Sequence, residues 1–483
     1  MLYNIEKKTK IVATIGPATD NYQMIVKLVK AGMNVMRINF SHGSYAEHLN
    51  KVLIAKRLEK EHGYFLPVML DTRGPEIRCG HFEEGGVEII RHQKVRISMT
   101  PLLGNREIFS IDYPGLFDDV KVGDHLKIDD GKLELLITEK DNEKRQLIVK
   151  ALNTHVLKDR KGINVPFARL SIPFISARDE ADLQWGCEQE VAFIAASFTR
   201  RKQDILDIKA ILEKYGSPHI QIIAKIENRE SLDNFEEILA VADGIMVARG
   251  DLGVEVPPEI VPVIQERLIR RCRQVGKTVI TATQMLDSMQ THPIPTRAEV
   301  SDVATAIKES TDAIMLSAES ASGEYPLESV EMQAKIAATI EKHLDYTELA
   351  AEAYCTSEQN NSDAIANSVA NTANLIKAAA IFCFSETGLS GMRIAKSRPA
   401  CPIICLTQKK NSAIKLALQW GVTTMIIHQL PQLIEDMEAI ALIKAHDLKI
   451  KPGSPIIITG GTPTGTGGTN FMRIVKVNQI REI

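Results

Sequence analysis

The feature that most constrains the fold is a set of eight short apolar runs, rich in β-branched side chains, that recur along the chain. Each run is apolar at consecutive positions and then turns polar. This pattern is typical of parallel strands buried on both faces, whereas a half-exposed strand would alternate apolar and polar residues. The runs are IVATIGP from Ile11, NVMRINF from Asn34, PVMLDT from Pro67, VAFIAASF from Val191, QIIAKIE from Gln221, GIMVARGD from Gly244, TVITATQM from Thr278 and AIMLSAES from Ala313.

Amphipathic stretches with a helical period lie between most of these runs, for example NYQMIVKLVKAG and EIVPVIQERLIRRCRQVG. The second stretch ends at Gly276, as a helix with a glycine C-cap does. Eight alternating strand and helix units are what a (β/α)8 TIM barrel requires, so we predict this α/β fold. A doubly wound open sheet has the same local pattern and stays the alternative.

The repeat is interrupted between Asp71 and Val191, where there is room for a whole additional domain. Apolar and polar residues alternate there, and the DDG at 129–131 is typical of a turn between two strands. We therefore predict a small antiparallel β-barrel domain over residues 75–165, inserted after the third strand of the TIM barrel. That loop opens at the C-terminal mouth of the barrel, so the insert is placed to act as a lid.

The alternation of strand and helix patterns ends after about His343, and the polar stretch EQNNSD predicts a linker. Strand-like runs then return, at AAAIFCFSE, PIICLT, TTMIIHQL and SPIIITGG. With helices between them, these runs predict a smaller open α/β domain over residues 344–483. The TIM barrel then takes residues 1–74 and 166–343, and the sequence predicts three domains.

Composition narrows the classes of function. The chain carries 58 basic and 61 acidic side chains, a formal net charge of −3, so we expect no nucleic-acid partner, which would need a basic excess. No apolar stretch approaches about 18 residues, and the start MLYNIEKKTK has no apolar signal core. We expect a cytoplasmic protein without a membrane partner. Seven cysteines without metal-ligand spacing indicate reduced core thiols rather than a disulfide framework.

Charged and polar side chains follow the apolar runs, at the point where each predicted strand ends. In a barrel these ends meet at one mouth, so cations and carboxylates converge there. Glu227 and Asp251 offer carboxylate oxygens to a divalent cation, and Arg37 and Lys225 offer positive charge to a phosphoryl group. The full strand-end set is Arg37, Asn39, Asp71, Thr72, Lys225, Glu227, Asp251, Thr283 and Glu319.

This set predicts a metal-dependent barrel enzyme that acts on a small anion. An enolate-forming aldolase or lyase would use the same carboxylate-held Mg²⁺, and it stays an alternative. A non-catalytic metabolite sensor, with the barrel as scaffold, is a second alternative. A mere scaffold, however, has no need of buried charges at its mouth.

Eight strings in this order closely resemble the pyruvate kinase family of bacterial type: TKIVATIGPAT, GMNVMRINFSHG, LDTRGPEIR, AKIEN, VARGDLGVE, TATQML, PTRAEVSDVA and LSAES. The resemblance runs from Thr9 to about Pro326, and the C-terminal domain fits more loosely. It implies a barrel, an inserted lid and a C-terminal regulatory domain, assembled as a homotetramer. It also implies phosphoryl transfer from phosphoenolpyruvate to ADP, giving pyruvate and ATP in the last step of glycolysis, with Mg²⁺ (or Mn²⁺) and K⁺ as cofactors.

The resemblance assigns catalytic roles residue by residue. Glu227 and Asp251 fall on the family's Mg²⁺ ligands. Lys225 falls on the lysine that stabilises charge on the moving phosphoryl group, and Arg37 on the arginine that contacts the phosphate. The substrate carboxylate would be held by the backbone of Gly250 and Asp251 and by the Thr283 hydroxyl, where the family also protonates the enolate.

Two further sites are implied near the barrel mouth. The K⁺ ligands would be Asn39, Ser41, Asp71 and Thr72, all of which offer oxygen atoms. The nucleotide would be bound by Asn39, His42, Arg78 and Lys161. Glu76 stands where K⁺-dependent members carry glutamate and K⁺-independent members tend to carry lysine. We therefore expect K⁺ dependence.

Two segments of the predicted C-terminal domain are rich in hydroxyls and glycines, SETGLS from Ser385 and GGTPTGTGGTN from Gly460. Backbone N–H groups in such segments at strand ends bind phosphates. The two segments match the family's sugar-phosphate effector pocket, which implies allosteric activation by a phosphorylated sugar or a nucleoside monophosphate. The implied effector contacts are Ser385, Thr387, Ser390, Thr464, Gly465 and Thr466.

Overall fold

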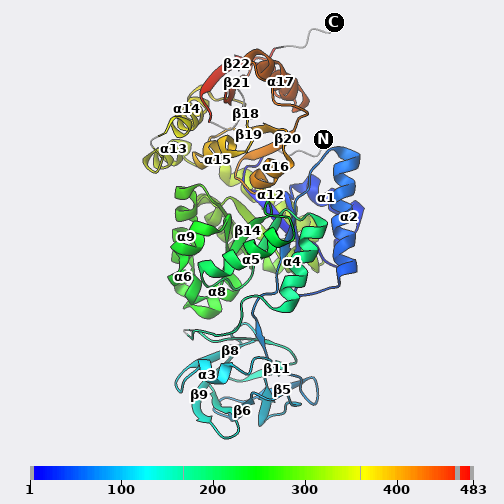
Figure 1. Cartoon of the computed structure of the whole chain (residues 1–483), viewed down its shortest axis with the longest axis vertical. Coiled ribbons are helices and arrows are strands. Elements are labelled where there is room, and N and C mark those ends of the chain that lie inside the picture. The colour runs from blue at the N-terminus through cyan, green and yellow to red at the C-terminus, as the bar shows by residue number, and fades with distance from the viewer. Residues whose placement is uncertain (1–4, 167, 359, 463–467, 479–483) are drawn as a thin grey trace.

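The computed structural model describes residues 5–166, 168–358, 360–462 and 468–478. Three parts follow one another along the long axis of the molecule (Figure 1). A barrel with its surrounding helices lies in the middle, a β-rich lid lies at one end, and an α/β domain lies at the other. Within the described residues, no helix is both long and apolar enough to cross a bilayer.

Eight parallel strands close into a barrel in the order β1-β17-β16-β15-β14-β13-β3-β2. Each of the eight apolar runs supplies one strand, so the predicted TIM barrel is confirmed and the open sheet was the wrong alternative. The strands are β1 Lys10–Thr14, β2 Val35–Asn39, β3 Val68–Asp71, β13 Phe193–Ala196, β14 Gln221–Ile226, β15 Gly244–Ala248, β16 Thr278–Ala282 and β17 Ala313–Leu316.

Helices surround the barrel and cover the outward faces of its strands (Figure 1). The helix that ends before Gly276 has the predicted C-cap, since Gly276 adopts a left-handed φ of 72°. The helices are α1 Tyr22–Ala31, α2 Tyr45–His62, α4 Ala177–Gln189, α5 Lys202–Lys214, α6 Arg229–Asp233, α7 Phe235–Val241, α8 Arg249–Glu255, α9 Val261–Val275, α10 Arg297–Lys308, α11 Ala318–Ala321 and α12 Pro326–Glu341, with short 3₁₀ turns at Pro258–Ile260 and Asp287–Gln290.

The lid forms a seven-stranded sheet in the order β4-β12-β8-β9-β10-β6-β7, with a separate β11-β5 pair. The predicted turn at Asp129–Gly131 joins β8 to β9, and all three of its residues have positive φ. The sheet is antiparallel except for the β6-β7 pair, which is parallel because the chain returns through residues 99–107 before β7 begins. The elements are β4 Ile77–Arg78, β5 Gly86–Ile89, β6 Lys94–Ser98, β7 Ile108–Ser110, α3 Leu116–Asp119, β8 His125–Ile128, β9 Leu133–Asp141, β10 Gln146–Ala151, β11 His155–Lys158 and β12 Gly162–Asn164.

The C-terminal domain is a five-stranded sheet in the order β20-β19-β18-β21-β22, and β22 alone runs antiparallel. The sequence analysis missed β22, whose largely exposed side chains give no buried apolar run. The elements are α13 Tyr346–Cys355, α14 Asn361–Ile376, β18 Ala380–Phe384, α15 Leu389–Lys396, β19 Ile403–Thr407, α16 Lys410–Leu416, β20 Val422–Ile426, α17 Ile434–Asp447, β21 Pro455–Gly460 and β22 Phe471–Lys476.

The C-terminal domain closes one end of the barrel core. Ile414 and Leu418 pack in the same apolar cluster as Val12, Met246 and other residues that fill the barrel interior. The opposite end, where the strands finish, is therefore the open mouth that faces the lid. All seven cysteines are free thiols as predicted, although Cys355 is exposed rather than in the core.

Candidate active site

The polar residues at the strand ends come together at the barrel mouth through strand register. Asn39 at the end of β2 pairs directly with Asp71 at the end of β3. Arg37 lies two residues before Asn39, and its Nε donates to Asp71 Oδ2 over 2.6 Å. Its Nη1 also donates to the Thr14 hydroxyl at 2.8 Å, at the end of β1. The guanidinium is thus fixed by two neighbouring strands.

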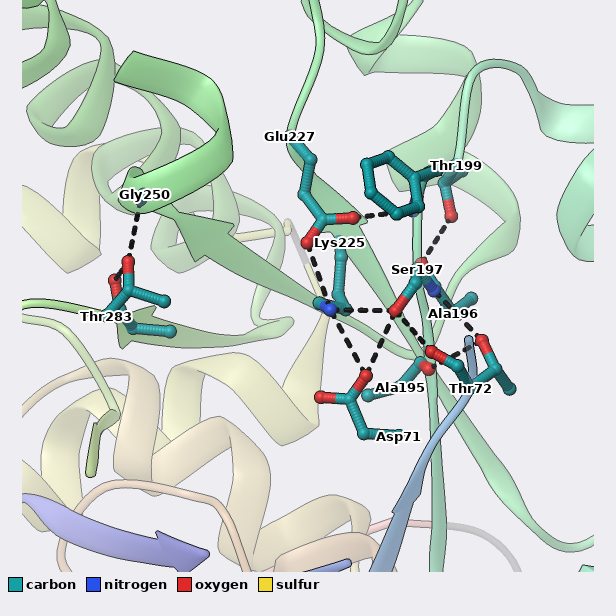
Figure 2. Close-up of polar contacts among 12 residues, drawn as sticks. Asp71, Thr72, Ala195, Ala196, Ser197, Thr199, Lys225, Glu227, Gly250 and Thr283 are labelled. Atoms are coloured by element: carbon teal, nitrogen blue, oxygen red, sulfur yellow. Dashed lines mark hydrogen bonds and ion pairs between the residues drawn. The ribbon is translucent and has the colours of Figure 1, made fainter. Parts of the chain in front are cut away.

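Lys225 lies at the centre of this network, as Figure 2 shows. Its ammonium has three close oxygen partners: Ser197 Oγ at 2.7 Å, Glu227 Oε1 at 2.9 Å and Asp71 Oδ1 at 3.1 Å. Burial by itself would lower the pKa of Lys225, but the carboxylates of Asp71 and Glu227 outweigh this effect and raise the pKa. The site therefore holds a permanent cation.

Asp71 carries the negative charge between the two cations. Burial by itself would raise the pKa of this carboxyl, but the charges of Arg37 and Lys225 outweigh it, and the pKa lies below its usual value. Removing Asp71 would leave Arg37 without its ion-pair partner and Lys225 with Glu227 alone, which is costly in a low-dielectric interior.

Glu227 is oriented by the chain that follows β13. Its Oε2 accepts a hydrogen bond from the backbone N–H of Phe198 at 2.5 Å. Phe198 has a φ of 54°, a left-handed conformation that is rare for a bulky residue. The strained backbone directs an N–H at the carboxylate, and such strain is typical of functional sites.

Asp251 lies in the first turn of α8 and is partly buried. Burial, together with the nearby Glu227 charge, raises the pKa of Asp251 to about 7. Within the described part of the chain, no group donates a hydrogen bond to this carboxylate. Asp251 and Glu227 are thus two shielded carboxylates that lie near each other. Such a pair is a suitable donor set for a hard divalent cation.

Hydrogen bonds also join the residues that follow β15 to those that follow β16. The Gly250 N–H donates to the Thr283 hydroxyl at 2.8 Å (Figure 2). Thr283 and Gln284 have positive φ values of 69° and 53°. The Arg249 guanidinium holds this turn, because its Nη2 donates to the Thr283 carbonyl at 2.7 Å while its Nη1 pairs with Asp302 at 2.7 Å.

The four oxygen-bearing residues expected to bind K⁺ come from two neighbouring strand ends. Asn39 Oδ1 accepts from the Ser41 N–H at 3.0 Å, and the Thr72 carbonyl accepts from the Ser197 hydroxyl at 2.6 Å. Asp71 is the strand partner of Asn39 and directly precedes Thr72 in the chain. These four residues thus lie at, or just beyond, the ends of the adjacent strands β2 and β3.

A pocket of about 410 Å³ opens between the barrel mouth and the lid. Residues expected on the nucleotide side contribute to its wall, and so does Asp251. Arg78 pairs with Glu76 at 2.6 Å, and Lys161 pairs with Asp129 at 2.9 Å, so each cation has a carboxylate partner at the pocket wall. The lining includes His42, Glu76, Arg78, Asp129, Lys161 and Asp251.

The expected effector contacts lie in the distant C-terminal domain. Ser385 caps the turn before α15 by accepting from the Gly388 N–H at 3.1 Å. Ser390 Oγ accepts from the Thr469 hydroxyl at 2.6 Å, so the two hydroxyl-rich segments do meet. Thr387 lies in the turn between Ser385 and Ser390. Thr464, Gly465 and Thr466 lie outside the described residues.

Glu319 behaves differently from the rest of the strand-end set. Its carboxylate accepts from the backbone N–H groups of Ser317 and Leu286, at 2.8 and 3.2 Å. The buried carboxylate thus joins the segments that follow β16 and β17.

Four residues that touch this network were not identified from the sequence: Thr14, Ser197, Phe198 and Arg249. Ser197 could have been found, because it is the one polar residue in the fourth run, VAFIAASF, and lies near its end. The backbone N–H of Phe198 carries no signal in the sequence, since any non-proline residue offers the same donor.

The fold and the site define a TIM-barrel enzyme whose mouth is built to neutralise an anionic group. A sequence model described as the pyruvate kinase barrel domain matches residues 6–330, and one described as the pyruvate kinase alpha/beta domain matches residues 363–475. The chain therefore belongs to the pyruvate kinase family, and it is a phosphotransferase.

Individual relatives agree with the family models. The chain is 44% identical over 477 residues to a pyruvate kinase of Geobacillus stearothermophilus, covering 99% of this chain and 81% of the relative. It is 45% identical over 476 residues to a pyruvate kinase of Staphylococcus aureus, covering 97% and 80%. A crystal structure of a pyruvate kinase from Cryptosporidium parvum superimposes with a TM-score of 0.91 at 34% identity, covering 98% of this chain and 96% of that one.

Proposed function

We propose that the protein transfers the phosphoryl group of phosphoenolpyruvate to ADP, giving pyruvate and ATP in the last step of glycolysis. The observation that carries this proposal is the Lys225 ammonium, which Ser197, Glu227 and Asp71 hold at 2.7 to 3.1 Å beside the Arg37 guanidinium. Two anionic substrates repel each other strongly in a low-dielectric pocket, and two fixed cations offset this repulsion.

In this proposal Arg37 and Lys225 bind the phosphoryl oxygens of phosphoenolpyruvate. An oxygen of the ADP β-phosphate attacks the phosphorus, the bond from phosphorus to the enol oxygen breaks, and enolpyruvate is left. Lys225 stabilises the charge that spreads over the transferred group. The substrate carboxylate lies at the backbone of Gly250 and Asp251 and at the Thr283 hydroxyl, on the side from which the enolate gains its proton.

Glu227 and Asp251 would hold Mg²⁺ or Mn²⁺. Among the described residues, no three His, Cys, Asp or Glu side chains gather as a metal cage. Two carboxylates suffice for Mg²⁺, which completes its coordination with water and substrate oxygens. When bound, the metal supplies positive charge that polarises those oxygens.

Asn39, Ser41, Asp71 and Thr72 would bind K⁺ through their oxygens, and the charge of that ion would stand in for a lysine that this chain lacks at Glu76. Asn39, His42, Arg78 and Lys161 would bind the nucleotide. In support of this assignment, three of these four residues line the pocket between lid and barrel.

The C-terminal domain would bind a phosphorylated activator, a sugar phosphate or a nucleoside monophosphate, at Ser385, Thr387 and Ser390 together with Thr464, Gly465 and Thr466. The meeting of Ser390 with Thr469 supports a single pocket formed by both segments. We also propose that the chain assembles as a homotetramer, as the resemblance implies.

The decisive experiment measures pyruvate and ATP formed from phosphoenolpyruvate and ADP, with Mg²⁺ and K⁺ varied separately. We expect equal amounts of both products and a requirement for both ions. A lyase would form no ATP, and a metabolite sensor would show no turnover. Either result would overturn the proposal.

A further inference from the structure

Ser197 lies immediately after β13 and is buried, with 2% of its surface exposed. Its hydroxyl oxygen contacts three groups at once, as Figure 2 shows. It accepts from Lys225 Nζ at 2.7 Å, and it lies 2.6 Å from the Thr72 carbonyl and 3.0 Å from Asp71 Oδ1. Among the side chains drawn in Figure 2, only that of Ser197 contacts both the Lys225 ammonium and the Thr72 carbonyl.

The backbone around Ser197 fixes this arrangement. The Ser197 N–H donates to the Thr72 hydroxyl at 3.1 Å, so the two loops are joined by a hydrogen bond in each direction. A Cβ at Gly74 would come within 2.7 Å of the Ser197 carbonyl oxygen, and Gly74 has a φ of 69°. The close approach of the loops after β3 and β13 therefore depends on glycine at position 74.

A hydroxyl has one proton and cannot donate to two acceptors at the same time. Ser197 therefore donates either to the Thr72 carbonyl or to Asp71 Oδ1. When it donates to Thr72, Asp71 Oδ1 depends on Lys225 for its hydrogen bond. When the Thr72 carbonyl is engaged by another positive group, the hydroxyl proton is available to Asp71, and Lys225 can direct an N–H elsewhere.

We propose that Ser197 is a positioning residue that couples the monovalent-cation ligands, through the Thr72 carbonyl and Asp71, to the Lys225 ammonium. This inference rests on the proposed function, since it assigns Thr72 and Asp71 to the K⁺ site and Lys225 to the phosphoryl group. Ser197 does not touch the substrate in this scheme. It sets the direction of the Lys225 N–H groups according to the state of the Thr72 carbonyl.

The test compares Ser197→Ala with wild type in K⁺ titrations of the complete enzyme. Loss of the hydroxyl removes the link, so we expect the K⁺ concentration for half-maximal activation to rise about fivefold or more. We expect kcat to fall while the KM for phosphoenolpyruvate changes little, because Lys225 and Arg37 remain. Ser197→Cys, which keeps a weak donor and acceptor, should fall between Ser197→Ala and wild type.

Thr199→Val is the matched control. Thr199 is buried in the same turn, and its hydroxyl donates to the Ala196 carbonyl at 2.9 Å without reaching Lys225 (Figure 2). A general loosening of the turn would raise the K⁺ requirement in this variant as well, and that result would count against a specific role for Ser197.

A second measurement needs no turnover. In substrate-free and Mg²⁺-free protein, we expect KCl to raise the Tm of wild type relative to tetramethylammonium chloride, and to raise the Tm of Ser197→Ala less at each concentration. If wild type responds to K⁺ in neither measurement, the K⁺ part of the proposed function is wrong, and the coupling falls with it. If wild type responds and Ser197→Ala responds identically, the positioning role alone is overturned. Should Ser197→Ala fail to fold, Ser197→Cys decides by the same criteria.

Discussion

The Lys225 ammonium lies 2.9 Å from Glu227 Oε1, so the cation assigned to the phosphoryl group is ion-paired with a carboxylate assigned to the divalent metal. Both side chains come from the end of β14, two residues apart, and point into the barrel mouth (Figure 2). Each group therefore affects the charge that the other presents to a ligand. Several consequences of this arrangement can be measured.

Replacing Lys225 with methionine removes a cation while keeping a long apolar side chain. We expect kcat to fall by at least about a hundredfold, because a charge aimed at the transition state is lost. The KM for phosphoenolpyruvate should change little, since Arg37 still binds the phosphate. Lys214→Met, at an exposed lysine paired with Glu180, is the control. Weakened substrate binding at unchanged kcat would place Lys225 in another role.

Glu227→Gln keeps the shape of a metal ligand but removes its charge. We expect the Mg²⁺ concentration for half-maximal activity to rise about tenfold or more, since Mg²⁺ prefers carboxylate oxygens. Chelation of the metal should abolish turnover in wild type, and added Mg²⁺ or Mn²⁺ should restore it. An unchanged Mg²⁺ requirement in Glu227→Gln would remove this residue from the metal site.

Glu76→Lys adds an ammonium at the pocket between barrel and lid. We expect activity in tetramethylammonium chloride to rise relative to activity in KCl, because the lysine supplies a charge that K⁺ otherwise supplies. The substitution also breaks the 2.6 Å ion pair with Arg78, which Glu76→Gln breaks without adding a cation. If both variants behave alike, the added charge is not responsible.

The buried carboxyl of Glu255 should make the stability of the protein depend on pH. Burial raises the pKa of this carboxyl to about 7, although the Asn164 side chain donates to it at 3.0 Å. The folded state thus disfavours the ionised form. The resulting loss of stability is absent below the ordinary pKa of about 4.5, grows as the pH rises toward 7, and is constant above that.

Glu255→Gln has no ionised form, so it should be more stable than wild type at pH 8 by about 3 kcal/mol. The difference should shrink toward pH 5. Thermal unfolding at the two pH values measures it, with the exposed Glu143→Gln in the lid as control. An equal shift of Tm at both pH values would mean that the charge of Glu255 is not the cause.

Arg249→Lys tests the turn that carries Thr283. Lysine cannot reproduce a planar fork that contacts the Thr283 carbonyl and Asp302 together. With the left-handed turn less firmly held, we expect the KM for phosphoenolpyruvate to rise about tenfold, since the Thr283 hydroxyl is assigned to the substrate carboxylate. Arg57→Lys, at an exposed arginine on α2, should have no effect. A fall in kcat at constant KM would argue against this role.

Much of this protein was determined by local sequence. Eight predominantly apolar runs predicted the number of barrel strands, because strands buried on both faces are mostly apolar at consecutive positions. The polar residue at the end of each run, Lys225 or Asp71 for example, could be placed at the mouth without coordinates, since parallel strands in a barrel all finish at one end.

Tertiary structure alone decided how these residues are connected. Two of the three oxygen partners of Lys225 are distant in sequence: Asp71 ends β3, and Ser197 directly follows β13. They meet Lys225 because β3, β13 and β14 are neighbours in the barrel. The left-handed backbone conformations of Phe198 and Thr283 also could not be predicted from local sequence, because neither residue type favours positive φ values. A sequence records which side chains are present at each strand end, but hydrogen bonds and ion pairs depend on distances that exist only once the barrel has closed.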